Sequence, residues 1–388
     1  MSGSRPLNRL GSATIDEFTL TKLTKARVQT AKELLECGPL FLMTNADLSL
    51  KEATSLIARV SEKLSSKPST ARQLLQHNAS RKAGMFLPSG LAPLDASMGG
   101  GFIVGTISEV CGPPGVGKTQ LCLSACVQSI VQRAREEGNV VNGTGKYSVV
   151  YIDTELKFDA QRLQEIAIHG FPGLFQEEQQ QQQQQQQHEG EPGTDIFSFG
   201  GHGNLDGLLR SVSVMQPTSS RELLQRIQDM QSDVISNGVR LVILDSVAAL
   251  ARREQLTEVE KNKYIVGQAA ALKTLAESCN CVVLATNQIQ PCSHKHESSH
   301  EEVLEDIIMD QGVAYRPSLG TAWQHCVTSR LVMCTDESSC VPDSQNIIRL
   351  DKVVVLDKSP FCATNCARIH FCIQEQGFVE NSQARPPR

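Results

Sequence analysis

The segment Gly112-Pro113-Pro114-Gly115-Val116-Gly117-Lys118-Thr119 fits the pattern G-x-x-x-x-G-K-[ST]. A β-like segment, residues 106–110, precedes it, and apolar residues at helical spacing follow it from Leu121 to Cys126. A strand, a glycine-rich loop and a helix in this order place backbone N–H groups around phosphate groups. Lys118 then reaches the β- and γ-phosphates, and the Thr119 hydroxyl is placed to ligate Mg²⁺. The sequence therefore predicts a site for ATP and Mg²⁺.

Length and composition limit the class of protein. The chain has 388 residues, of which 40% are hydrophobic, so it can bury a sizeable core and form roughly two or three domains. No apolar run reaches the ~18 residues of a membrane span, and residues 1–10 lack the apolar core of a signal peptide. We therefore expect a soluble intracellular protein with no membrane partner.

The first part of the chain differs from the rest in charge. Residues 1–83 carry thirteen Lys/Arg against seven Asp/Glu, whereas the whole chain has a net charge of −5. The sequence Ser49-Leu50-Lys51-Glu52 has the form of a capping box, and apolar residues at helical spacing follow it to Leu64. We expect a small all-helical domain over residues 1–67, whose charge fits either nucleic-acid contact or an ordinary solvated surface. Periodicity is lost over residues 68–88, which predicts a linker.

The remainder, residues 89–388, has the pattern of an α/β fold. Three continuous apolar runs predict buried parallel strands at 148–152, 241–244 and 281–284. Helical stretches precede them, for example residues 221–236 and 267–278, so we expect a mostly parallel sheet with helices on both faces. Later apolar runs predict further, antiparallel strands at 330–334, 352–356 and 369–373.

Two stretches are expected to interrupt this core. Residues 179–187 are all glutamine, and the composition around them predicts a disordered insertion over residues 176–204. Residues 291–318 show no clear periodicity, which predicts a long mobile loop.

Polar side chains follow three of the predicted strands, at the sheet edge where α/β proteins bind ligands. Asp245 follows one run and is the candidate that holds Mg²⁺ together with Thr119. Glu155 follows another, and a carboxylate there could orient and deprotonate an attacking water. Gln288 follows the third, where a neutral amide can hydrogen-bond a γ-phosphate and respond to its loss. Together with Lys118, these residues predict a site for ATP hydrolysis.

These motifs resemble the RecA-like recombinase family, in particular its eukaryotic branch of strand-exchange proteins and paralogues, and within that branch the B-type paralogues. The resemblance covers most of the chain and rests on residues 112–120, 151–155, 241–246 and 286–289. Similarity to the paralogues rests on Leu-Gly-x-x-Trp-x-His at 319–325 and Lys-Ser-Pro at 358–360. The resemblance implies a RecA-like ATPase core after an N-terminal domain of the helix-hairpin-helix type.

The resemblance also implies roles for single residues. Glu155 would be the catalytic base, and Gln288 would couple the γ-phosphate to a DNA-facing loop. Gln120 would join the glycine-rich loop in holding the nucleotide. The protein as a whole would be a nuclear, DNA-dependent ATPase of weak activity.

Departures from the strand-exchange members weaken the expectation of DNA binding. Asp47 stands where those members have a glycine, and it tolerates a positive φ less well. Residues 291–318 occupy the position of the second DNA-binding loop, but they hold two basic against six acidic residues, and this charge repels phosphate. Lys358 stands where those members have Asp, and either reaches the nucleotide of a neighbouring subunit or faces solvent. We expect Trp323, the sole tryptophan, to pack in the core or at an interface.

The function that these observations favour is that of an ATP-binding recombinase paralogue. It would act in a hetero-oligomer with other paralogues and promote assembly of the strand-exchange recombinase on single-stranded or branched DNA, in homologous recombination repair of double-strand breaks. The alternative is a strand-exchange recombinase that itself forms filaments on single-stranded DNA. An unrelated GTPase is a third candidate, but Asn287-Gln288-Ile289-Gln290 is not the Asn-Lys-x-Asp motif that reads guanine.

Overall fold

The structure is a computed structural model. It describes Leu7, Leu10 and residues 14–65, 70–73, 84–136, 141, 146–175, 202–291, 308–310, 313–317, 319–342 and 348–381. The chain divides into two compact units, Met1–Arg81 and Lys82–Arg388. The predicted insertion at 176–204 lies outside the described residues up to position 201, as do much of the predicted linker and residues 292–307.

The first unit is helical in its described part. Its helices are α1 (Glu17–Lys25), α2 (Ala31–Asn45) and α3 (Leu50–Leu64). The predicted capping box begins α3: the Ser49 hydroxyl accepts the Glu52 backbone N–H at 3.3 Å, and the Glu52 carboxylate accepts the Ser49 N–H at 2.8 Å. Ala53, Leu56 and Val60 are buried, so the predicted helical spacing is confirmed.

The described helices of the first unit carry no basic excess. Residues 14–65 hold seven Lys/Arg and seven Asp/Glu, so the excess found over residues 1–83 lies in the flanking segments. Asp47 has a φ of 49°, a conformation that costs glycine less than other residues. Lys22 donates to the Asp47 backbone oxygen at 2.7 Å. The net charge of these helices therefore gives no support for nucleic-acid contact.

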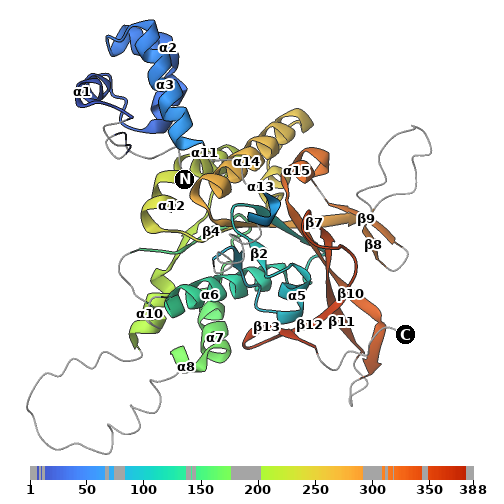
Figure 1. The fold of residues 1–388 in the computed structure, drawn as a ribbon. Helices are drawn as coiled ribbons and strands as arrows, with labels where there is room; N and C mark the ends of the chain where they lie inside the picture. Colours follow the sequence, from blue (N-terminus) through green and yellow to red (C-terminus); the bar gives the residue numbers. More distant parts are fainter. Residues whose placement is uncertain are drawn as a thin grey trace, which may run out of the picture. The chain divides into compact units, whose positions relative to one another are not determined.

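A large sheet forms the centre of the second unit (Figure 1), with the strand order β13-β12-β11-β10-β3-β7-β6-β4-β5. In chain order the strands are β3 (Ile107–Gly112), β4 (Val149–Asp153), β5 (Val212–Met215), β6 (Leu241–Asp245), β7 (Val282–Pro291), β10 (Ser329–Pro342), β11 (Ile348–Lys358), β12 (Ile369–Gln374) and β13 (Gly377–Glu380). Neighbours from β10 to β5 pair in parallel, and β11, β12 and β13 extend the sheet by antiparallel pairing. The carboxyl ends of β3, β4, β6 and β7 therefore meet at one edge.

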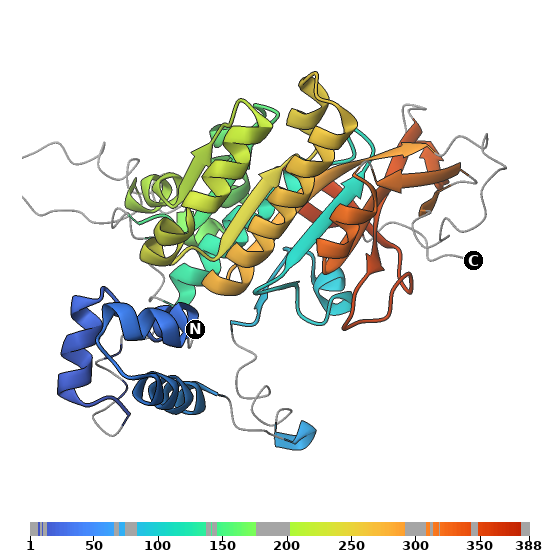
Figure 2. The same ribbon diagram turned by 90° about the horizontal axis from the view of Figure 1, so that it is seen from above.

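Helices cover both faces of this sheet (Figure 2). Side chains alternate along each strand, so Leu241 and Ile243 of β6 belong to one hydrophobic cluster, and Val242 and Leu244 belong to the other. The first cluster includes α6 (Lys118–Glu136) and α7 (Ala160–Gly170), and the second includes α11 (Ser220–Asp229), α12 (Gln231–Asn237), α14 (Glu258–Cys279) and α15 (Gly320–Cys326). The predicted α/β class, with a mostly parallel sheet between helices, is confirmed.

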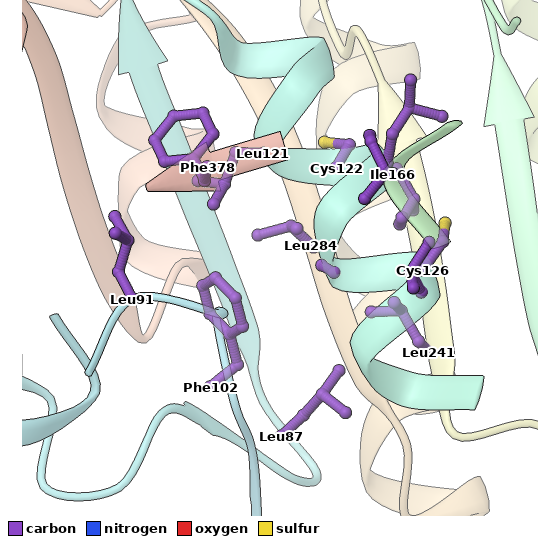
Figure 3. Packing of buried hydrophobic residues seen from close by; sticks show 14 of the residues in the cluster. Leu87, Leu91, Phe102, Leu121, Cys122, Cys126, Ile166, Leu241, Leu284 and Phe378 are labelled. Atoms are coloured by element: carbon purple, nitrogen blue, oxygen red, sulfur yellow. The ribbon is translucent and has the colours of Figure 1, made fainter. Parts of the chain in front are cut away.

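The packing of α6 fixes the start of that helix at the carboxyl edge of the sheet. Figure 3 shows Leu121, Cys122 and Cys126 of α6 beside Leu241 and Leu284 of the sheet, all within one buried cluster. Full burial of a leucine contributes about 1.5–3 kcal/mol. Burial also raises the pKa of both thiols, which keeps them protonated and unreactive.

Three local features differ from the sequence-based expectations. β10 pairs in parallel with β3 and only its other neighbour, β11, is antiparallel. Two short strands lie within the expected loop: β9 (Val313–Pro317) pairs with β7, and β8 (Ile308–Asp310) pairs with β9. β1 (Phe86–Leu87) pairs with β2 (Phe102–Ile103), so the core begins before residue 89. Strands of two to five residues are too short to show a hydrophobic pattern in the sequence, and only their pairing with other strands identifies them.

Four short helices complete the described part of the second unit. They are α5 (Ala92–Ser97), α8 (Pro172–Phe175), α10 (His202–Arg210) and α13 (Ala249–Arg253). α10 begins inside the range expected for the insertion, which therefore ends earlier than predicted. None of the described helices is long and apolar enough to cross a membrane.

Candidate functional site

The glycine-rich loop joins the end of β3 to the first residue of α6. Two of its glycines leave no room for a side chain. A Cβ on Gly112 would lie 2.5 Å from the Met333 backbone oxygen, and a Cβ on Gly117, whose φ is +119°, would lie 2.7 Å from Cδ1 of Ile373. The loop is therefore packed closely against β10 and β12, and it leads directly into the N-terminus of α6, where backbone N–H groups are free to bind an anion.

A cleft of about 270 Å³ lies beside this loop. It is lined by Pro114, Gly115, Gly117, Lys118, Thr119, Gln120, Glu155, Lys157, Asp245, Ser246, Thr286, Gln288 and Ile373. Of the other predicted loop residues, Gly112 and Pro113 present their carbonyl oxygens to Lys118, and Val116 is buried in the hydrophobic cluster. The structure thus brings the three predicted strand-end residues to the same cleft as the loop.

Lys118 is partly buried and has no acidic partner in direct contact among the described residues. Its Nζ donates to the backbone oxygens of Gly112 at 2.8 Å and Pro113 at 2.9 Å. Burial lowers the pKa of Lys118, although the charges of Asp245 and Glu155 act in the opposite direction. An ammonium held by neutral carbonyls in a cleft is suited to bind an anion such as a phosphate.

Asp245 is buried, and hydroxyl groups surround its carboxylate. Oδ2 accepts from the hydroxyls of Thr119 and Tyr151, both at 2.8 Å, and Oδ1 accepts from that of Thr286 at 2.6 Å. Within the described chain, no Lys or Arg forms an ion pair with Asp245. The adjacent oxygens of Thr119 and Asp245 are the hard ligands that Mg²⁺ prefers, and the carboxylate charge is left for a cation.

Glu155 lies in a turn that Asp153 organises. The Asp153 carboxylate accepts the backbone N–H groups of Glu155 at 3.2 Å, Lys157 at 3.1 Å and Phe158 at 2.9 Å. Nζ of Lys157 lies 2.5 Å from Oε2 of Glu155, and this hydrogen bond raises the pKa of Lys157. The candidate base is therefore presented to the cleft as one half of an ion pair.

Arg252 of α13 connects Glu155 to Gln288. Its Nη1 donates to Oε1 of Gln288, and its Nη2 lies 3.9 Å from Oε1 of Glu155. The two candidates are 133 positions apart in the chain, yet one guanidinium contacts both. Any movement of Gln288 toward a ligand therefore changes the partners of Arg252.

Gln120 is held from the opposite side by Arg162 of α7. Nε of Arg162 donates to Oε1 of Gln120 at 2.8 Å, and its Nη1 and Nη2 donate to the backbone oxygens of Glu375 at 3.1 Å and Gln374 at 2.5 Å. These carbonyls lie at the end of β12 and in the turn that leads to β13. Arg162 thus fixes the β12–β13 hairpin beside the first turn of α6.

Sequence reasoning missed several residues of this site, and the reasons differ. Tyr151 and Thr286 sit inside apolar strands, where they read as ordinary strand residues. Arg252 acts on Gln288, which only the fold brings near, whereas Lys157 lies two positions after Glu155 and only the shape of the turn pairs them. Ser246 is 2% exposed and lines the cleft, and its hydroxyl has no hydrogen-bond partner among the described residues. The available signal was its position directly after Asp245, within the segment 241–246 on which the family resemblance rests.

The side chains fit a nucleoside triphosphate with Mg²⁺. The closely packed glycines shape the loop, Lys118 offers a cation, and Asp245 with Thr119 offers hard oxygen ligands. The orphaned Ser246 hydroxyl adds a buried polar atom that a ligand can satisfy.

Comparisons with known proteins show similarity to DNA repair proteins. Residues 80–178 match the Rad51 family model. The chain is 28% identical over 394 residues to "DNA repair protein RAD51 homolog 2" of Homo sapiens, covering 95% of this chain and 93% of that protein. The Arabidopsis thaliana protein of the same name is 28% identical, with 78% and 76% covered. "DNA repair protein RAD51 homolog 3" of Cricetulus griseus is 27% identical, with 92% and 88% covered.

Proposed function

We propose that this chain is an ATP-binding recombinase paralogue in homologous recombination repair. The proposal starts from the match of residues 80–178 to the Rad51 family model and from the similarity to RAD51 homologues 2 and 3 along most of the chain. It works in the nucleus with other paralogues and promotes filament assembly by the strand-exchange recombinase on DNA. The observation that carries ATP binding is the contact of the Thr119 hydroxyl with Asp245, beside Lys118.

In this proposal each residue of the cleft has one task. The loop N–H groups and Lys118 bind the phosphates, and Thr119 with Asp245 holds Mg²⁺, which supplies charge neutralisation at the phosphate oxygens. Glu155 orients a water and accepts its proton, and Gln288 binds the terminal phosphate through its amide. The Ser246 hydroxyl is a further hydrogen-bond donor in the cleft.

The surroundings of Glu155 support slow hydrolysis. Lys157 holds one of its two carboxylate oxygens, Oε2, at 2.5 Å, so a water has to be taken up at Oε1 unless Lys157 moves. ATP then acts chiefly as a switch that is bound and slowly released. Glu155→Gln should keep nucleotide affinity and stop turnover, whereas Lys118→Ala should abolish binding; titration calorimetry and phosphate release measure the two. Turnover that survives in Glu155→Gln would remove Glu155 from its role.

The acidic segment between β7 and α15 supports a paralogue rather than a strand-exchange enzyme. Residues 291–318 hold Lys295 and Arg316 against six Asp/Glu. Affinity for a nucleic-acid backbone comes largely from Lys/Arg that displace counterions, and this segment offers few. The neutral helices of the first unit add no compensating charge.

The function is tested with the purified full chain, ATP, Mg²⁺ and homologous single- and double-stranded DNA. Alone, the chain should not exchange strands. Added to a strand-exchange recombinase of the Rad51 family, with partner paralogues, it should speed filament growth on single-stranded DNA, and Lys118→Ala should not. Robust strand exchange by the chain alone would contradict the paralogue role and favour a recombinase.

A further inference from the structure

A buried polar network crosses the sheet three residues before the glycine-rich loop. Glu109 of β3 is fully buried, and its carboxylate accepts three hydrogen bonds. The donors are Nε of Arg330 at 2.7 Å, Nε1 of Trp323 at 2.8 Å and Nδ2 of Asn287 at 2.9 Å. They come from β10, α15 and β7, so one carboxylate joins four elements of the core.

One end of this network reaches the nucleotide cleft. Oδ1 of Asn287 accepts the backbone N–H of Gln288 at 2.8 Å, and Gln288 lines the cleft. The side chain of Asn287 therefore sets the position of the Gln288 backbone while its amide nitrogen is held by Glu109.

The other end reaches α15 and the end of β11. Trp323 is fully buried in α15, and Nζ of Lys358 donates to the backbone oxygen of the next residue, Gln324, at 2.8 Å. α15 begins directly after residues 291–318. This helix thus contacts Glu109 through Trp323 and Lys358 through the Gln324 backbone.

We propose that Glu109 is a positioning residue that couples Gln288 to α15, so that a nucleotide in the cleft changes the surroundings of Trp323. This inference rests on the proposed function, because it requires nucleotide binding. A buried charge that loses one of its partners pays a desolvation penalty, so Asn287, Glu109 and Trp323 shift together rather than separately. A terminal phosphate that draws Gln288 toward it moves Asn287, and Glu109 carries the displacement to the indole.

Trp323 is the only tryptophan of the chain, so tryptophan fluorescence reports the surroundings of this one indole. The full chain is titrated with a non-hydrolysable ATP analogue and with ADP, each with Mg²⁺, while calorimetry records binding. We expect a saturable change with the ATP analogue and a smaller change with ADP, which lacks the phosphate that Gln288 binds. Binding with no fluorescence change would overturn the coupling. No binding at all would overturn the proposed function itself.

Asn287→Ala removes the two hydrogen bonds of the Asn287 side chain, to the Gln288 backbone and to Glu109, and leaves the hydrogen bond between Trp323 and Glu109 in place. We expect this variant to bind nucleotide and to lose the fluorescence change. The matched control is Asn237→Ala, because that side chain contacts only its own helix, α12, and its neighbour Ser236; it should keep both properties. A full response in Asn287→Ala would overturn the proposal.

A second measurement needs no substitution in the network. The single indole N–H gives one resonance in a nitrogen-edited NMR spectrum, and its shift reports the hydrogen bond to Glu109. We expect the resonance to move when the ATP analogue binds. An unmoved resonance at saturation would overturn the coupling even if Asn287→Ala fails to fold.

Discussion

Glu109 in the interior of the sheet and Asp245 at its carboxyl edge are both buried carboxylates, with exposed fractions of 0% and 4%, but their surroundings are opposite. Arg330 balances the charge of Glu109 at 2.7 Å. Asp245 accepts hydrogen bonds from three hydroxyl groups, and no described Lys or Arg forms an ion pair with it. Glu109 is therefore directly paired with a cation, whereas the cations nearest to Asp245, among them Lys118, act on it only from beyond ion-pair distance.

We interpret this difference as one of role: Glu109 stabilises the fold, and Asp245 is available to bind a ligand. Burying a charge is costly unless it is paired, so a carboxylate supported only by hydroxyls keeps part of that cost until a cation arrives. In the sequence, Asp245 is marked by its position at the end of an apolar run, whereas Glu109 lies inside a strand and gives no such signal. The partners of both carboxylates come from distant elements, so only the structure shows which charge is directly paired.

The largest effect should come from breaking the balanced pair. Glu109→Gln leaves Arg330, which is 2% exposed, without its nearest counter-charge, and should lower the free energy of unfolding by about 3–5 kcal/mol. Asp245→Asn is the matched control, since it strands no cation and should cost less in the absence of nucleotide. Urea denaturation measures both. Equal losses would mean that the two carboxylates do not differ as described.

A smaller effect is expected from the hydroxyl groups around Asp245. Thr286→Val keeps the side-chain shape but removes the 2.6 Å hydrogen bond to Oδ1, and should cost about 2 kcal/mol, typical of a bond to a charged group. Thr274→Val, at an exposed position of α14 where the hydroxyl contacts only the backbone of Ala270, should change stability far less. Unfolding curves in which the two variants coincide would show that Asp245 does not depend on its hydroxyl partners.

The smallest effect concerns the contribution of Lys118 to the pH dependence of the free energy of unfolding. Burial places its folded-state pKa below the unfolded value of 10.5, so the unfolded chain binds more protons over the pH range between the two. Lys118 therefore adds a rise in nucleotide-free stability as pH increases toward 10.5. Lys118→Met should flatten this part of the curve, measured as the difference between variant and wild type at each pH. A steeper rise in the variant would show that the sign is wrong.

Much of the fold followed from local patterns. β4, β6 and β7 could be predicted from continuous apolar runs, because these strands are buried on both faces of the sheet. The helices α3 and α6 could be predicted from the 3.6-residue spacing of their apolar residues. The site candidates Glu155, Asp245 and Gln288 could be predicted because parallel strands end at one edge.

Other features could not be predicted because they depend on contacts between distant residues. The parallel pairing of β10 with β3 joins segments more than 200 positions apart. Arg252 reads as a surface cation in sequence, and only the fold sets it between Glu155 and Gln288. Trp323 was expected in the core or at an interface and is buried in the core, but its bond to Glu109 left no signal in the sequence.

The most direct test of the unbalanced charge at Asp245 is calorimetric titration of wild type and Asp245→Asn with a non-hydrolysable ATP analogue, with and without Mg²⁺. If Asp245 reserves its charge for the metal, Mg²⁺ should strengthen binding to the wild type, and this gain should vanish in Asp245→Asn while metal-free binding through Lys118 persists. An equal Mg²⁺ gain in both proteins would contradict that role.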